Sequence, residues 1–290
     1  KIIMESIFFI CLLNKQLTIT IMKKLLIFVF ALVATSASAQ YYVGMSGGFA
    51  MPSATSYMGT ELNGTTKTTE YGSFGEGMNF TLKAGYFFND KFGVELAAGY
   101  LYGADQVRDY AGYDVNAYAR VMRVAPTLVY NITDKVYGKF GAMVPVGGKT
   151  VAEIQTVGAD GKPNGYVKGE QEFKGKFGMG VTGALGYKYS LGNNFSLFAE
   201  LEYIGLSVDR DTSEWTEFNA LGAVFGAANP ITLKDLPYKH PVAGIVLMPK
   251  EYTYVDTLPT TNTDPSKVLG ETAPYSSFGI NFGITYTFGK

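Results

Sequence analysis

The last segment of the chain alternates strictly between large apolar and small polar positions. From Phe278 to Phe288 every even position is Phe, Ile or Tyr, and the odd positions between them are Gly, Asn or Thr. Because successive side chains of a β-strand point to opposite faces, this pattern predicts a strand with one wholly apolar face. The width of that face indicates that the strand borders an apolar medium.

Seven further segments of about ten residues show the same two-residue period. They are 41–49, 78–88, 92–102, 122–130, 136–146, 177–189 and 195–203. A tilted strand that crosses a bilayer needs about 9–11 residues. The pattern predicts an all-β fold, an eight-stranded antiparallel up-and-down transmembrane β-barrel, because no stretch shows a convincing helical period over three turns.

The connections between these segments alternate in length. Three are short (89–91, 131–135 and 190–194), and four are long (roughly 51–76, 103–117, 147–175 and 208–274). Short turns on one side and long loops on the other are typical of an outer-membrane barrel. The pattern therefore places both chain ends on the periplasmic side and the long loops outside the cell.

Aromatic residues recur at the periplasmic ends of the apolar face. Seven of the eight end positions are aromatic: Tyr41, Phe88, Phe92, Tyr130, Tyr189, Phe195 and Phe288. Amphipathic rings favour the boundary between lipid and water, so these residues are expected to form an interfacial girdle. A soluble barrel of the lipocalin kind would also alternate, but it has no reason to align aromatics at one level.

The opposite face carries charges in mid-strand. They are Lys83, Glu95, Arg123, Lys139, Lys188, Glu200 and Glu202. Side chains fill an eight-stranded barrel, so charges inside it must pair or be hydrated. With Phe88 facing Phe92, Lys83 lies diagonal to Glu95, and these two are expected to pair. Glu200 and Glu202 are expected to pair with the remaining cations, which makes the cluster a structural plug; a gated narrow pore is the alternative.

The N-terminal region has the features of an export signal. Met22-Lys23-Lys24 precedes an apolar run, and Ala37-Ser38-Ala39 follows it. This arrangement predicts a signal peptide over 22–39 that is cleaved before Gln40. Residues 1–21 are interpreted as upstream over-translation, and 40–290 as the barrel domain.

Composition narrows the function classes. Aromatic residues make up 14% of the 290 residues and charged residues 17%, and the net charge is −1. Removing 1–39 takes away four lysines and one glutamate, which leaves 20 basic and 24 acidic side chains and a net charge of −4. That balance disfavours nucleic-acid binding. The only cysteine, Cys11, lies in the removed region, so no disulfide is expected.

The whole pattern over 40–290 resembles the small outer-membrane β-barrels of the OmpA transmembrane-domain and OmpX type. The resemblance implies a location in the outer membrane of a Gram-negative bacterium, contact with its lipid, and insertion by the barrel assembly machinery. That machinery recognises a C-terminal strand that ends in an aromatic residue, as Phe278 to Phe288 does. Gly289 and Lys290 depart from the pattern, because the family often ends on Phe itself.

Three motifs point to chemistry only weakly. Gly178 to Gly183 matches GxGxxG, but no helix pattern follows, so the glycines fit barrel packing better. Asp209 to Ser213 resembles the start of a calcium loop but lacks its glycine and its final glutamate. His240, the only histidine, is the one candidate for lipid A-modifying chemistry. No enzyme activity, cofactor or metal is expected.

The fourth long loop, 208–274, is too long to be structureless and is expected to be functional or partly folded. Its run Tyr252 to Val255 predicts a short strand, and Asp160-Gly161 and Asn164-Gly165 predict a hairpin in the third loop. The candidate residues for recognition of an extracellular ligand or partner are Trp215, Phe218, Phe225, Tyr252 and Tyr254. A lid that packs on itself is the equal alternative.

The function that follows is a structural or surface-interaction role, in which a closed barrel displays long loops. A narrow small-solute channel is the first rival, and a lipid A-modifying enzyme is the second.

Overall fold

The computed structural model describes residues 40–53, 56–63, 66–110, 112–157, 163–221, 227–239, 244 and 246–288. These residues form β-strands, turns and one short 3-10 helix, η2 (Leu233–Asp235). Within the described ranges, no helix has the length and hydropathy needed to cross a membrane.

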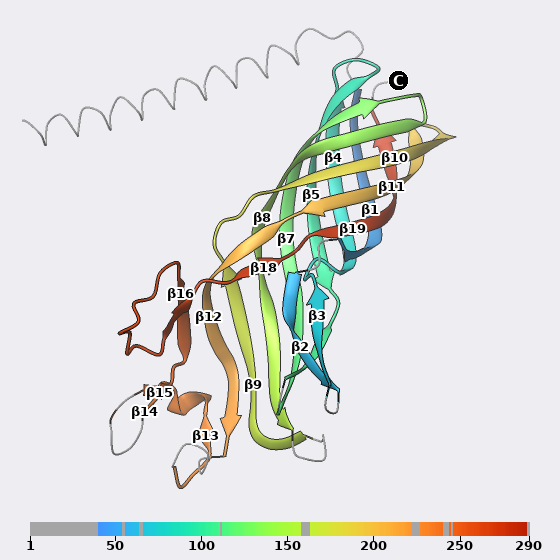
Figure 1. The fold of residues 1–290 in the computed structure, drawn as a ribbon. Helices are drawn as coiled ribbons and strands as arrows, with labels where there is room; N and C mark the ends of the chain where they lie inside the picture. Colours follow the sequence, from blue (N-terminus) through green and yellow to red (C-terminus); the bar gives the residue numbers. More distant parts are fainter. Residues whose placement is uncertain are drawn as a thin grey trace, which may run out of the picture.

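Eight antiparallel strands close into a barrel (Figure 1). They are β1 (Gln40–Pro52), β4 (Gly77–Phe87), β5 (Phe92–Gly103), β7 (Tyr113–Asn131), β8 (Val136–Val157), β10 (Gly180–Gly192), β11 (Phe195–Gly205) and β19 (Ser277–Thr287). The ring closes because β19 pairs with β11 on one edge and with β1 on the other. The eight-stranded barrel predicted from alternation is therefore confirmed.

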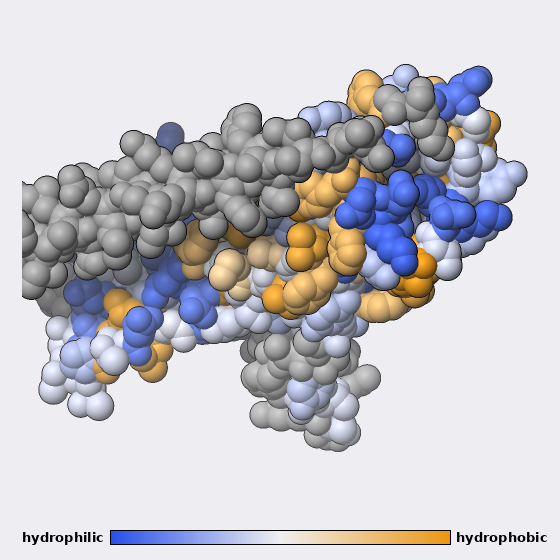
Figure 2. Space-filling model, turned by 90° about the horizontal axis from the view of Figure 1, so that it is seen from above, coloured by the Kyte–Doolittle hydropathy of each residue, from blue (hydrophilic) through white to orange (hydrophobic). Residues whose placement is uncertain are grey.

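The two faces of the wall differ as the alternation predicts. Outward side chains such as Leu82, Leu128 and Phe140 are exposed, whereas the neighbouring Lys83 is buried inside. Figure 2 looks onto the molecule from above, where hydrophobic patches lie next to hydrophilic ones. An apolar surface that surrounds a barrel is suited to lipid and not to water.

The short turns use residues that tolerate unusual backbone angles. Gly192, Asn193 and Asn194 join β10 to β11 with φ values of 84°, 49° and 68°. Asparagine and glycine adopt this left-handed region more readily than other residues, so the sequence suits a tight hairpin. In the β4–β5 turn, the Asn89 side chain accepts a hydrogen bond from the Lys91 backbone N–H.

On the opposite side, β7 and β8 continue beyond the barrel into an outer region (Figure 1). Its strands are β2 (Ser56–Asn63), β3 (Thr66–Gly72), β6 (Gln106–Tyr110), β9 (Pro163–Gly175), β12 (Ser207–Ala220), β13 (Ile231–Thr232), β14 (Tyr238–Lys239), β15 (Val246–Met248), β16 (Glu251–Val255), β17 (Lys267–Leu269) and β18 (Thr272–Pro274). Among them, β2–β3 and β14–β15 form two small sheets of their own. We call these strands, with the outer ends of β7 and β8, the extension.

Much of the sequence expected to be loop is thus strand. β9 pairs with β8 on one side and with β12 on the other, so the third loop is a hairpin, as predicted. Asp160-Gly161 lies outside the described residues, and Asn164-Gly165 belongs to β9. The predicted short strand at 252–255 corresponds to β16.

One barrel strand starts later than its alternation indicates. The pattern predicts a strand from Phe177, but β10 begins at Gly180. The reason is that the preceding residues follow β12: the Lys176 N–H donates to the Asp209 carbonyl oxygen at 2.8 Å. Phe177 to Met179 therefore lie outside the regular wall.

The extension has a hydrophobic core of its own. Its buried members are Trp215, Phe218, Ala220, Ile231 and Leu236. The rings of Trp215 and Phe218 meet edge to face with centroids 5.2 Å apart. Residues far along the fourth loop, such as Met248 and Tyr252, pack against this core and join the loop into one folded unit.

Replacing Trp215 by Ala should loosen this unit without opening the barrel. Trp215 is 6% exposed, and a buried Trp→Ala change costs about 3–5 kcal/mol. We expect faster proteolytic cleavage within 227–239 and 246–250, while the barrel strands stay resistant to the protease. Leu221→Ala, at an exposed position, is the control. Equal cleavage rates in the two variants would contradict the packing described.

Candidate functional site in the barrel lumen

Tyr42, Gly85 and Glu95 lie side by side on β1, β4 and β5 and point into the lumen. The Tyr42 hydroxyl donates to Glu95 Oε2 at 2.7 Å, across the intervening strand. The ring can take this path only because position 85 has no side chain: a Cβ there would overlap the ring of Tyr42.

The same arrangement recurs across the barrel. Tyr137, Gly186 and Glu200 are aligned on β8, β10 and β11. The Tyr137 hydroxyl donates to Glu200 Oε1 at 2.6 Å, and a Cβ on Gly186 would overlap the ring of Tyr137. Each glutamate is thus held in place by a tyrosine from two strands away.

Two lysines join the glutamates into one cluster. Lys139 Nζ lies 2.8 Å from Glu95 Oε1 and 2.9 Å from Glu200 Oε1. Lys83 Nζ lies 2.8 Å from Glu200 Oε1 and 3.9 Å from Glu95 Oε2. It also sits 3.4 Å from the centroid of the Phe198 ring, in cation–π geometry. We call Lys83, Glu95, Lys139 and Glu200 the ion-pair ring.

The ion-pair ring is neutral and buried. Its four side chains are 2–9% exposed, and its two positive and two negative charges balance. The residues come from β4, β5, β8 and β11, so the ring connects opposite sides of the wall. Paired charges with additional hydrogen bonds are the condition under which burial is tolerated.

A second polar layer lies further toward the extension. Arg123 Nη2 donates to Asn79 Oδ1 at 2.8 Å, and Arg123 also interacts electrostatically with Glu202. Glu202 accepts hydrogen bonds from Asn281 Nδ2 at 2.9 Å and from Thr182 Oγ1 at 3.3 Å. Arg123 and Glu202, both predicted to face the interior, therefore belong to this layer.

Apolar side chains fill the lumen on the side of these layers that is nearer the extension. The first and fourth loops contribute Phe74, Ala273 and Tyr275, and the Tyr275 and Thr150 hydroxyls are hydrogen-bonded at 2.5 Å. We call the cluster the apolar plug, and its buried members are Phe74, Leu101, Ala119, Val121, Ala125, Met143, Ile204, Leu206, Val208, Ala273 and Tyr275. The apolar plug separates the ion-pair ring from the extension.

On the periplasmic side the lumen stays open as a vestibule of about 470 Å³. Lys83 and Glu95 form part of its inner end, and Lys188 lines its wall. Lys188 is half-buried. This predicted interior charge therefore faces the vestibule and not the ion-pair ring.

The predicted girdle residues lie around the short-turn end. Tyr41, Phe92, Tyr130, Tyr189, Phe195 and Phe288 are exposed, and Phe88 is half-buried. Several stack in pairs, such as Phe92 with Tyr130 at 5.0 Å between centroids. Tyr86, which the sequence analysis did not single out, fills the gap between Tyr41 and Phe88.

The predicted recognition residues lie mostly inside the extension. Trp215 and Phe218 belong to its core, Tyr254 is buried, and Tyr252 is half-buried. Phe225 and His240 lie outside the described residues. As placed, the four described side chains hold the extension together and offer little surface to a partner.

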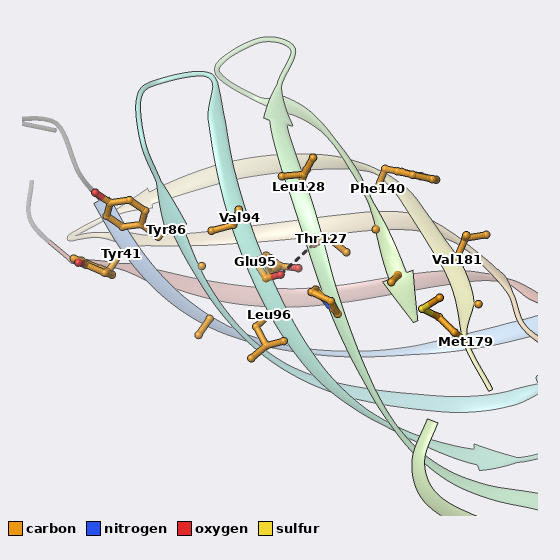
Figure 3. A pocket seen from close by; sticks show the side chains of 16 residues that line it. Tyr41, Tyr86, Val94, Glu95, Leu96, Thr127, Leu128, Phe140, Met179 and Val181 are labelled. Carbon is orange, nitrogen blue, oxygen red and sulfur yellow. Dashed lines mark hydrogen bonds between the residues drawn. The ribbon is translucent and has the colours of Figure 1, made fainter. Parts of the chain in front are cut away.

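The lipid-facing wall carries a wide depression of about 820 Å³ (Figure 3). Tyr41 and Tyr86 lie at one end and Met179 and Val181 at the other, while Leu128 lies between. Glu95 appears in the same view, but its side chain turns into the lumen. Its backbone oxygen accepts a hydrogen bond from the Thr127 hydroxyl. The depression is thus an outer surface feature, separate from the lumen.

Replacing Glu200 by Gln should destabilise the barrel strongly. The change leaves two buried lysines with one carboxylate, and removing one partner of a buried pair costs about 3–5 kcal/mol. We expect a lower denaturant midpoint, with most of the loss recovered when Lys139→Met is added. Lys250→Ala, which removes an exposed pair with Glu214, should leave the midpoint unchanged. A stable single variant would contradict the ion-pair ring.

Gly85→Ala should also destabilise the barrel, because the added methyl group displaces the Tyr42 ring. Overpacking of this kind costs about 1–3 kcal/mol. Gly47→Ala is the matched control, since the nearest atoms to a Cβ there lie 3.8 Å away. Denaturant unfolding should separate the two variants; equal midpoints would refute the tight Tyr42–Gly85 contact.

The comparison with protein families agrees with this architecture. The family model for the outer membrane protein beta-barrel domain matches residues 25–228. Among curated proteins, none matches this chain.

Three solved structures are similar to the chain at low sequence identity. A major outer membrane protein of Thermus thermophilus is 13% identical, with 86% of this chain and 99% of that chain covered and a TM-score of 0.42. OprG of Pseudomonas aeruginosa is 13% identical, with 88% and 98% covered and a TM-score of 0.39. Ail of Yersinia pestis, in complex with the heparin analogue sucrose octasulfate, is 12% identical, with 87% and 99% covered and a TM-score of 0.34.

The family match covers more than half of the chain and includes seven of the eight barrel strands. The chain belongs to the family of the outer membrane protein beta-barrel domain and is an integral protein of the outer membrane.

Proposed function

We propose that this protein is a closed barrel that anchors the extension in the outer membrane and presents it to a macromolecular partner outside the cell. The observation that carries the proposal is the filled lumen: the ion-pair ring, the Arg123–Asn79 layer and the apolar plug follow one another along the barrel axis. A barrel of eight strands has room for little beyond its own side chains.

The extension supplies the surface that such a role requires. Tyr71, Tyr113 and Tyr166 are exposed on it, and so are Val107 and Leu269. Tyrosine is enriched at the centres of protein interfaces because its ring buries a large area while its hydroxyl keeps a polar contact. These five residues replace the buried aromatic residues as the candidates for recognition.

Export and insertion form part of the same proposal. Strand β1 begins at Gln40, the residue that would follow signal-peptide cleavage. Strand β19 closes the barrel and leads to the exposed Phe288, which would serve as the aromatic mark for the assembly machinery. We assign no catalytic role.

A narrow channel for small solutes is the second candidate, and one observation favours it. The periplasmic vestibule of about 470 Å³ reaches Lys83 and Glu95, so ions can approach the ion-pair ring from that side. Conduction would require both the ring and the apolar plug to open. The anchor needs no such rearrangement and is therefore preferred.

Replacing Tyr71, Tyr113 and Tyr166 together by Ser should abolish recognition and leave the barrel folded. Interface tyrosines often contribute about 2 kcal/mol or more each, and about 1.4 kcal/mol corresponds to tenfold in affinity. The measurement is adhesion of cells that express the protein to an array of immobilised extracellular proteins and glycans. The wild type should bind at least one surface, and the triple variant should bind it at least tenfold more weakly.

Substitution of Ser for Tyr189, a girdle tyrosine on the membrane side, is the control and should leave adhesion intact. Wild-type cells that adhere no better than cells lacking the protein would contradict the display role.

A further inference from the structure

The barrel wall is interrupted between β8 and β10. Strand β8 pairs with β10 up to Met143 and with β9 from Thr150 onward. Among the described residues, no strand pairs with Val144–Lys149 on this side. Lys176 follows β12 and not β8, which leaves this stretch of the wall without a neighbouring strand among those described.

The local sequence explains why the interruption persists. Pro145 has no backbone N–H and so cannot donate to a neighbouring strand. Arg123 pairs with Pro145 while Met122 pairs with Gly147, so Val146 is an extra residue in a β-bulge. Bulges bend a strand and end regular pairing, so β8 turns away from β10 at this point.

A cavity of about 230 Å³ fills the interruption. Val146 and Phe177 stand at its outer mouth, and Phe177 is 82% exposed, the largest value among the exposed hydrophobic residues described. Inside, the cavity reaches Val121, Leu206 and Val208 of the apolar plug. It therefore leads from the lipid-facing surface to an apolar end inside the barrel.

The wide depression on the outer wall approaches the same place. It ends at Met179 and Val181, just after Phe177 in the chain (Figure 3). Both residues are exposed on the lipid-facing surface. The depression is lined by exposed apolar side chains, so hydrocarbon is the medium along it. The mouth of the cavity lies beside the Met179 end of the depression, with Val146 and Phe177 toward the lipid and Lys149 and Lys176 on the rim.

The two lysines on the rim of the cavity each form an ion pair with an acidic side chain. Lys176 is ion-paired with Asp256 at 2.8 Å, and Lys149 is ion-paired with Glu172. The other polar groups of the lining, the Thr150 and Tyr275 hydroxyls, are hydrogen-bonded to each other. The part of the lining that is left for a ligand is its apolar part, Val121, Leu206 and Val208. The cavity volume of about 230 Å³ admits the end of a hydrocarbon chain, since an apolar protein cavity of about 150 Å³ holds a benzene molecule.

We propose that this cavity is a binding site for one hydrocarbon chain of a membrane lipid, which enters from the bilayer between β8 and β10 and ends against the apolar plug. We call it the wall site, defined by Val121, Val146, Gly147, Phe177, Leu206 and Val208. The site is independent of the display role of the extension, and it gives the lipid a specific contact beyond the general belt.

The sole tryptophan allows a contact test. Trp215→Phe combined with Phe173→Trp places the only indole in the wall of the cavity, at a position that pairs with Thr150 and Ser213 on the inner face. In bilayers of phospholipids with brominated acyl chains, bromine quenches an indole that it touches. We expect at least twofold quenching relative to unbrominated bilayers. Tyr275→Trp in the Trp215→Phe background is the second reporter, since Tyr275 also lines the cavity.

Gly147→Leu is the blocking variant. A Cβ at position 147 meets no atom within 4 Å, so a leucine fits and fills the mouth. Gly47→Leu adds the same side chain where a Cβ makes only ordinary contacts with Asn79 and Phe80, away from the wall site. Quenching should fall to the unbrominated level in the first variant and persist in the second.

Folded reporters that show no quenching, with folding checked by circular dichroism, would overturn the proposal. Quenching that survives Gly147→Leu would show that the chain does not enter through the wall site. Quenching by free brominated fatty acid in unbrominated bilayers, without quenching by brominated phospholipid, would contradict a membrane lipid as the occupant.

Discussion

Four buried charges in a lumen only eight strands wide are the constraint on which the rest of this structure depends. Lys83, Glu95, Lys139 and Glu200 are stable there only as a neutral, hydrogen-bonded set. Two tyrosines complete the bonding of the glutamates, and each must cross a neighbouring strand to do so. This requirement explains the glycines at 85 and 186, because a side chain at either position would overlap the aromatic ring of the crossing tyrosine.

If the lumen is closed, as we propose, interactions with other molecules take place at the surfaces of the barrel and of the extension. The ion-pair ring and the apolar plug connect the barrel strands from inside, and β7 and β8 continue from the barrel into the extension. The core around Trp215 supplies the apolar burial that offsets the entropic cost of ordering a long loop. At the bulge at Val146 the regular pairing of β7 with β8 is interrupted, and the side chain of Val146 is exposed on the outer surface.

The sequence predicts the barrel well because alternation is a local signal. The number of strands and their inside and outside faces follow from it, and the up-and-down order follows from the short and long connections between the strands. The limits of β10 do not, because Phe177 continues the alternation while the fold pairs its neighbours with β12. Alternation records which face a residue occupies, but not which strand lies beside it.

The site was harder to predict than the fold, for two reasons. Lys83 lies 3.9 Å from the predicted partner Glu95 but only 2.8 Å from Glu200, because contacts across a lumen depend on the tilt of the strands as well as on pairing. Tyr42 was missed for the same reason, since its role appears only when Gly85 and Glu95 are aligned beside it. Trp215 illustrates the second reason: an aromatic residue in a long loop looks exposed until the loop is seen to fold around it.

The closure of the lumen is the central claim, and single-channel conductance of the refolded protein in a planar bilayer tests it most directly. The account predicts no steady current from the wild type. Steady openings of the wild type, with an ion selectivity that changes in Lys139→Ala and Glu95→Ala, would contradict it.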